Sequence, residues 1–206
     1  MHTRRDSRAA RLARPAAFLI LGLALLQGCS SRTPDNMQPP PGHGPYTGTV
    51  EDWPLWFIEH EFGAHCFSTL SCVVNYSGFA HGGNSPRPSL ESLGRPLDRI
   101  LRTGWGPYRN FPAPAEVRWT SLDGTRLEAS VDIAEVFADR MIRHTLAKEE
   151  VKEETSIPPP GVMLLVDDRT ISVYMRTWIW LKEPRNPENP HSDLHSDLVL
   201  VHSKRY

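Results

Sequence analysis

The chain has 206 residues, of which 39% are apolar and 23% charged, with a formal net charge of −1. These values exclude a chain that is disordered throughout and indicate one soluble globular domain or two very small ones. Residues 1–28 carry five arginines against the single acid Asp6, which leaves −5 for residues 29–206. An acidic remainder argues against nucleic-acid binding, which depends on basic patches, so we expect no nucleic-acid partner.

The N-terminus has the pattern of an export signal. Residues 1–14 are basic, and residues 15–26 are almost wholly apolar. An apolar run of this length is too short for a membrane-spanning helix, which takes about 20 residues, but is typical of the central part of a secretory signal. The alternatives are an ordinary signal peptide with an incidental cysteine after it and an uncleaved membrane anchor.

The sequence Leu26-Gln27-Gly28-Cys29 resembles the lipobox of bacterial lipoproteins. The resemblance implies cleavage after Gly28 and lipidation of Cys29, whose acyl chains would anchor the protein in a membrane. Ser30 follows the cysteine, and by resemblance to enterobacterial sorting rules this favours the outer membrane, with the protein facing the periplasm.

Residues 30–50 are rich in Pro, Gly, Ser and Thr and nearly lack large aliphatic side chains. This composition predicts an extended tether, or else a poorly ordered terminus without a role. The sequence therefore predicts three parts: a signal peptide at 1–28, an acylated cysteine with its tether at 29–50, and a single globular domain at 51–206.

Two cysteines, Cys66 and Cys72, lie within the predicted domain. Paired thiols in an oxidising periplasm tend to form disulfides, and a short loop or hairpin can close this spacing. We therefore predict a disulfide between them rather than a metal site or a catalytic thiol.

The first half of the domain reads as short strands and loops. An aromatic run at 53–59 predicts a strand, and residues 73–76 predict a second one. The composition of residues 81–95 is typical of a loop, and residues 96–102 suggest a helical turn.

A hairpin and a helix follow. Residues 116–122 alternate, Asp123-Gly124 is a strong signal for a two-residue turn, and residues 127–131 form the returning strand. Asp132 is a candidate N-cap, and the apolar spacing after it predicts a helix from Ile133 to about Glu150.

The C-terminal part again predicts strands, in this order: strand 162–166, turn 167–169, strand 171–181, proline-rich loop 183–197 and strand 198–202. The expected fold class is α+β, a mostly antiparallel β-sheet with one main helix, at about 133–150, packed on it.

Four short motifs together resemble a known family: Thr103-Gly104-Trp105-Gly106, the run PAEVRWTS at 114–121, the Asp123-Gly124 turn, and the run ISVYM at 171–175. The family consists of small Gram-negative lipoproteins classed as domain of unknown function 2931, and the resemblance covers roughly residues 50–182. It supplies no catalytic residues. For some such lipoproteins it implies a role as an immunity partner of secreted toxins, including lipases. Leu127 departs from the pattern, since an aromatic often follows the hairpin turn.

The search for catalytic chemistry finds weak signals. His81-Gly82-Gly83-Asn84 is similar to the oxyanion loop of some esterases, but the sequence has no G-x-S-x-G motif. His191 and His195 lie in a predicted loop without the register that would align metal ligands, and the histidines near Cys66 are read as solvated loop residues. We therefore predict no catalytic residue, no metal and no cofactor.

Trp178 and Trp180 are the candidate partner surface, because they share one face of a predicted strand. If the sheet covered that face, they would instead belong to the core. The expected function is a lipid-anchored, periplasm-facing binding protein with a protein partner, such as a toxin that it neutralises. The alternatives are a small envelope hydrolase and a structural envelope lipoprotein.

Overall fold

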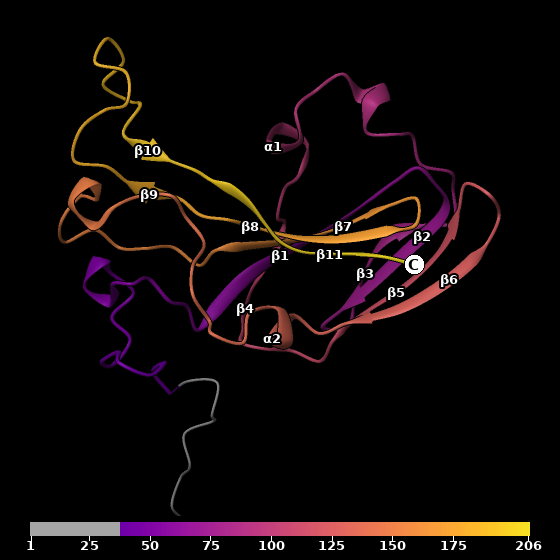
Figure 1. Cartoon of the computed structure of the whole chain (residues 1–206), viewed down its shortest axis with the longest axis horizontal. Helices are drawn as coiled ribbons and strands as arrows, with labels where there is room; N and C mark the ends of the chain where they lie inside the picture. Colours follow the sequence, from indigo (N-terminus) through magenta and orange to yellow (C-terminus); the bar gives the residue numbers. More distant parts are fainter. Residues whose placement is uncertain (1–37) are drawn as a thin grey trace, which may run out of the picture. The chain divides into compact units, whose positions relative to one another are not determined.

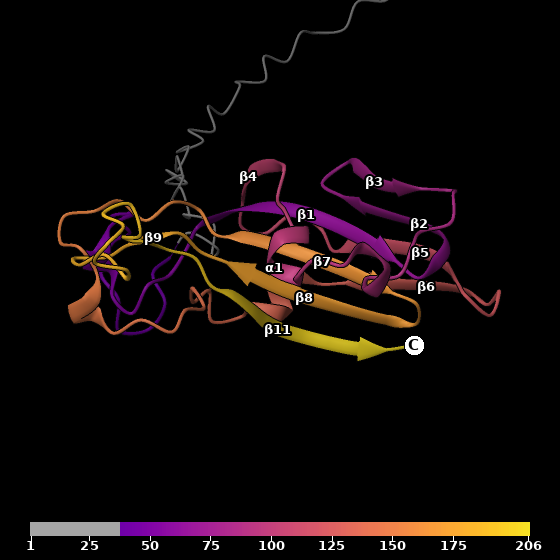
Figure 2. The same cartoon turned by 90° about the horizontal axis from the view of Figure 1, so that it is seen from above.

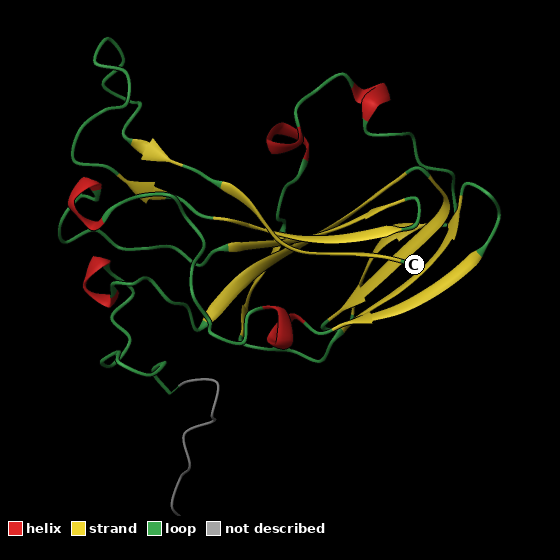
Figure 3. Ribbon diagram, viewed as in Figure 1, coloured by secondary structure: helices red, strands yellow, loops and turns green. Residues whose placement is uncertain are grey.

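The computed structural model describes residues 38–206 (Figure 1). The predictions for Gly28, Cys29 and the signal peptide therefore lie outside the described residues. Within the described part, strands dominate and each helix is only one turn long (Figure 3). None of these helices is long and apolar enough to cross a membrane.

The larger sheet has five strands in the order β11-β8-β7-β1-β4, which lie side by side in Figure 2. Its members are β1 (Glu59–Phe67), β4 (Trp105–Arg109), β7 (Gly161–Asp167), β8 (Thr170–Arg176) and β11 (Leu198–Arg205). All neighbouring strands are antiparallel except β1 and β7, which run parallel.

The second sheet has four antiparallel strands in the order β3-β2-β5-β6. They are β2 (Thr69–Tyr76), β3 (Phe79–Gly83), β5 (Ala115–Ser121) and β6 (Arg126–Val131). A small separate ladder pairs β9 (Ile179–Trp180) with β10 (Leu194–His195).

One apolar core joins the two sheets. It takes Phe62, Leu164 and Val173 from the five-stranded sheet and Val74 and Trp119 from the four-stranded sheet. Because every second residue of a strand faces the same side, two half-apolar sheets that bury a common face form a sandwich. The observed fold is thus mostly β, as predicted.

The other face of the five-stranded sheet is covered by residues 84–104, which include η3 (Glu91–Leu93) and α1 (Leu97–Ile100). Leu101 of this segment packs with Met163 and Leu165 in a second apolar cluster. Strand β7 is therefore buried on both faces, which explains its uninterrupted apolar sequence.

Several local predictions are confirmed. Cys66 and Cys72 form a disulfide, α1 lies in the predicted helical turn, and β5 and β6 form the predicted hairpin. The hairpin connection is wider than two residues, because Ser121 N donates to Thr125 O and Gly124 N donates to Ser121 O.

The predicted main helix at 133–150 is wrong. Asp132 caps a helix as expected, by accepting from Ala134 N and Glu135 N, but α2 spans only Ile133–Val136. The following chain makes a turn at 137–139 and then has no helix until the short η4 (Lys148–Glu150). Its apolar side chains Ile142 and Leu146 enter the sandwich core, and this tertiary burial outweighs a helix that is costly to nucleate.

Two predicted strands also differ from the structure. Residues 53–58 are irregular, and the strand begins at Glu59, because Trp56 and Phe57 are buried as loop residues. The predicted strand 171–181 is broken after Arg176, where Thr177 and Trp178 separate β8 from β9. The predicted loop at 81–95 begins with the end of β3.

Part of the predicted tether packs on the domain. Val50 is buried at the start of η2 (Val50–Asp52), and the ring of Tyr46 lies against that of Trp56. Asp52 accepts hydrogen bonds from Thr47 N and Gly48 N. The described part of the tether is thus fixed by specific contacts, despite its composition.

Candidate ligand-binding site

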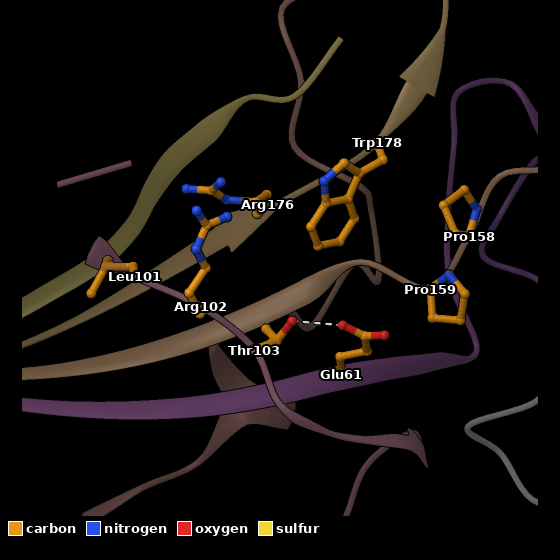
Figure 4. Close-up of a pocket in the computed structure, with 8 residues that line it drawn as sticks. All are labelled: Glu61, Leu101, Arg102, Thr103, Pro158, Pro159, Arg176 and Trp178. Carbon is orange, nitrogen blue, oxygen red and sulfur yellow. Dashed lines mark hydrogen bonds between the residues drawn. The ribbon is translucent and has the colours of Figure 1, made fainter. Parts of the chain in front are cut away.

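A hollow of about 420 Å³ opens where β8 ends and the covering segment approaches β1 (Figure 4). It is lined by Glu61, Leu101, Arg102, Thr103, Pro158, Pro159, Arg176 and Trp178. Its volume lies within the range of small-molecule sites, about 300–1,000 Å³.

Small residues on two strands let the covering segment lie close to the sheet. A Cβ atom at Gly63 of β1 would overlap the carbonyl oxygen of Arg102, and one at Gly161 of β7 would overlap the side chain of Thr103. His65 Nε2 lies 2.8 Å from the carbonyl oxygen of Arg102. The close approach therefore sets the position of Arg102 and Thr103 in the hollow.

Arg176 is a buried cation with incomplete hydrogen bonding. Only 8% of the residue's surface is exposed to solvent. Nη2 donates to the carbonyl oxygen of Asp98, whereas Nε is buried without a partner. Burial, and then the nearby charge of Arg102, lower the pKa of the Arg176 guanidinium.

Arg102 faces Arg176 in the hollow (Figure 4). Among the described residues, neither guanidinium lies within 4.0 Å of a carboxylate. The nearby carboxylate of Asp98 lies 3.8 Å from Arg99 Nε. The two guanidinium groups therefore repel each other, and the charge of Asp98 offsets this repulsion only in part.

A second hollow of about 400 Å³ shares Arg102 and Arg176 with the first. Two further arginines, Arg99 and Arg185, line it. It also has two acids, Asp98 and Asp197. Asp197 is already engaged, because it accepts from the backbone and hydroxyl of Thr145 and lies 2.8 Å from His195 Nε2. The two hollows together are lined by four arginines and by three acids, Glu61, Asp98 and Asp197, so positive charge is in slight excess, although residues 29–206 as a whole are acidic.

A carboxylate and a hydroxyl form the floor of the first hollow. Thr103 Oγ1 donates a hydrogen bond of 2.6 Å to Glu61 Oε2 (Figure 4). The Thr103 hydroxyl engages Oε2 and not Oε1, so the Glu61 carboxylate presents an acceptor in the hollow that Arg102 and Arg176 also line. The site can therefore bind an anion and also accept hydrogen bonds from neutral groups.

The structure separates the two predicted surface tryptophans. Trp178 is partly buried and lines the first hollow. This hollow, which contains Arg102 and Arg176, is called the arginine hollow below. Trp180 is 41% exposed and lines a different depression, with Lys152, Ser156 and Asp193 among its neighbours. The two tryptophans therefore do not form one continuous partner surface.

Sequence reasoning missed the arginines and Glu61. The available signal was Arg176, a charged residue between Met175 and Trp178 in a strand that otherwise reads as buried. The partners of Arg176 could not be found in this way, because Arg102 and Glu61 come from a covering loop and from a strand far away in sequence.

The other sequence motifs have local structural roles. Gly82 lies in β3, where a Cβ atom would overlap the carbonyl oxygen of Cys72 on the paired strand. This close approach accounts for the glycine. Within residues 38–206, no group of three or more His, Cys, Asp or Glu side chains is arranged to hold a metal ion.

An exposed aromatic pair bridges the edges of the two sheets. Phe79 of β3 and Trp105 of β4 stack with ring centroids 5.1 Å apart, and they are 46% and 51% exposed. The ring of His81 meets Trp105 edge-on. Exposed aromatic side chains of this size are typical of contact surfaces.

The chain was compared with models of protein families, with curated proteins and with solved structures. None of the three comparisons finds a match. The candidate site is therefore defined by its geometry and charge alone.

Proposed function

We propose that the protein is a lipid-anchored binding protein of the cell envelope, facing the periplasm, that holds an anionic group of its partner between Arg102 and Arg176. The observation that carries the proposal is the buried Arg176 guanidinium, whose Nε has no partner. A buried cation is costly unless an anion or hydrogen bonds compensate for it. An oxyanion bound in the hollow, which Arg176 lines, would supply the counter-charge.

The anchor is the second component of the proposal, and it rests on the lipobox at Cys29. More than one acyl chain on this cysteine would keep the domain at a membrane surface. Proteins held at a surface in this way meet ligands of the same envelope at high local concentration. This location suits a binding function.

Anion binding is tested by thermal unfolding of the full chain in phosphate and in chloride of equal ionic strength. We expect phosphate to raise the unfolding temperature of the wild type, and Arg102→Gln to abolish the increase. Arg205→Gln is the matched control, because Arg205 is an exposed arginine of β11 outside the hollow. Equal unfolding temperatures of the wild type in both salts would contradict the binding role.

Anchoring is tested by cell fractionation and mass measurement. The wild type should partition with membranes and carry acyl mass, and Cys29→Ser should lose both properties. If the wild type and Cys29→Ser partitioned equally with membranes and neither carried acyl mass, the result would contradict the proposed lipid anchor.

A second candidate function is that of an immunity-type protein that neutralises a secreted toxin. The observation that favours it is the stacked pair Phe79–Trp105, because exposed aromatics on strand edges can anchor a protein partner. The test is survival of cells exposed to a toxin encoded beside this gene. Protection that is lost in Trp105→Ala but kept in Arg102→Gln would favour this function over anion binding.

A further inference from the structure

We infer that the arginine hollow recognises a phosphorylated sugar, with the phosphate at Arg102 and Arg176 and the sugar ring beside Trp178. The inference rests on the proposed function, because it names the ligand class of the same hollow. It follows from three kinds of group that line the hollow: a pair of guanidinium groups, an apolar wall, and a carboxylate with a hydroxyl.

The first kind is the pair of guanidinium groups. Each presents a planar fork of N–H donors, which matches the oxygens of a phosphate better than a single ammonium does. Two neighbouring guanidinium groups that have no carboxylate within 4.0 Å among the described residues suit a dianion. A phosphate monoester carries about two negative charges at neutral pH, whereas a carboxylate carries one.

The second kind is an apolar wall. Figure 4 shows the two arginines on one side of the hollow, and the indole of Trp178 with Pro158 and Pro159 on the other. Inorganic phosphate would leave this wall without a contact. A pyranose has a face of C–H groups that packs on an indole and on proline rings, as other apolar surfaces do.

The third kind is the Glu61–Thr103 pair between those two sides (Figure 4). A carboxylate would repel a ligand that is anionic throughout, but it accepts hydrogen bonds well from hydroxyl groups. A ligand with an anionic end and a hydroxylated ring satisfies the arginines and Glu61 together. This combination favours a sugar phosphate over a fatty acid, a dicarboxylate or free phosphate.

The experiment is calorimetric titration of the purified full chain with four probes: glucose 6-phosphate, inorganic phosphate, glucose and uridine monophosphate. We expect glucose 6-phosphate to bind at least about tenfold more tightly than phosphate, which corresponds to about 1.4 kcal/mol. Glucose alone should bind too weakly to detect, because it leaves the two guanidinium groups without a counter-charge.

Two variants test which side chain binds the sugar and which binds the phosphate. Trp178→Ala should lose the advantage of glucose 6-phosphate over phosphate and keep the affinity for phosphate. Its matched control is Trp180→Ala, two residues along the chain and outside the hollow. Arg102→Gln should weaken both phosphorylated sugar and phosphate at least tenfold. It replaces an exposed residue, so folding should be unaffected.

The outcomes are distinguishable. Equal affinities for phosphate and glucose 6-phosphate, or no effect of Trp178→Ala, would overturn the sugar assignment and leave the proposed anion-binding function standing. Tighter binding of uridine monophosphate than of glucose 6-phosphate would overturn it in favour of a nucleotide. If no anion bound, or if Arg102→Gln had no effect, both the inference and the proposed anion-binding function would fail.

Discussion

Two buried polar clusters of this protein differ in how completely their groups are partnered. Inside the sandwich, His60 is fully buried, with Nδ1 at 2.7 Å from Asn110 Oδ1 and Nε2 at 2.8 Å from Tyr76 Oη. Asn110 Nδ2 in turn donates to the carbonyl oxygen of Phe57. In the hollow, by contrast, Arg176 retains an unused donor and faces a second cation.

The difference indicates different roles. Buried polar groups that satisfy one another stabilise a fold, and removal of one member leaves the others unpaired. A buried cation with an unused donor contributes little to the fold, and Arg176 lines the hollow, where a ligand can meet its guanidinium. The His60 cluster is therefore expected to govern stability, and the Arg176 cluster to govern binding.

The largest expected effect is that of His60→Ala. It creates a cavity and leaves Asn110 and Tyr76 without their partner, so the free energy of unfolding should fall by about 4 kcal/mol. Urea denaturation measures this change. Tyr76→Phe is the matched control, because it removes only one hydroxyl and should cost about 1 kcal/mol. A loss below 1 kcal/mol in His60→Ala would contradict the structural role.

Acid should destabilise the protein through the same histidine. Burial lowers the pKa of His60 to about 4, against 6.5 for an unperturbed histidine. Between pH 6.5 and 4 the unfolded chain therefore takes up a proton that the folded chain does not. The loss of stability attributable to His60 should be on the order of 3 kcal/mol and complete near pH 4.

Burial also lowers the pKa values of His65 and His144, which adds to the effect in the same direction. Denaturation curves at several pH values measure the slope. His60→Gln, which retains hydrogen-bonding groups but does not titrate, should flatten it. An unchanged slope in this variant would show that other groups cause the acid sensitivity.

Gly63→Ala should damage the hollow and the fold together. The added methyl group would overlap the Arg102 carbonyl oxygen, so the covering segment must shift. We expect a loss of about 2 kcal/mol and of the stabilisation by phosphate. Gly44→Ala is the control, because a Cβ there meets no atom within 4 Å. Retention of both properties in Gly63→Ala would contradict the close approach.

The smallest expected effect on stability is that of Arg176→Met. Loss of the hydrogen bond to Asp98 should be offset by removal of a buried, poorly compensated charge, so the change should stay within about 1 kcal/mol. Phosphate should no longer stabilise the variant. Thermal unfolding with and without phosphate tests both points. A loss as large as that of His60→Ala would make Arg176 a structural residue and remove the contrast between the two clusters.

The predictions from local sequence succeeded where a few neighbouring residues decide the outcome. The hairpin around Asp123-Gly124, whose connection is nevertheless wider than the predicted two residues, the Asp132 cap and the apolar strand at 162–166 depend on backbone preferences and short-range patterning. The prediction of a helix from Ile133 to about Glu150 failed, because Ile142 and Leu146 gain more by entering the core from an irregular chain. Trp178 was found as a candidate, but its assignment to a hollow with two arginines was not.

The sequence by itself determined the mostly β character and the disulfide pair, since each depends on residues close together in the chain. The export signal and lipobox stay predictions. Only the tertiary structure decided which strands share a sheet and that Glu61, Arg102 and Arg176 meet in one hollow. The reason is physical: residues this far apart in sequence come together only when burial of the apolar faces fixes the topology, and a single sequence carries no local signal for that choice.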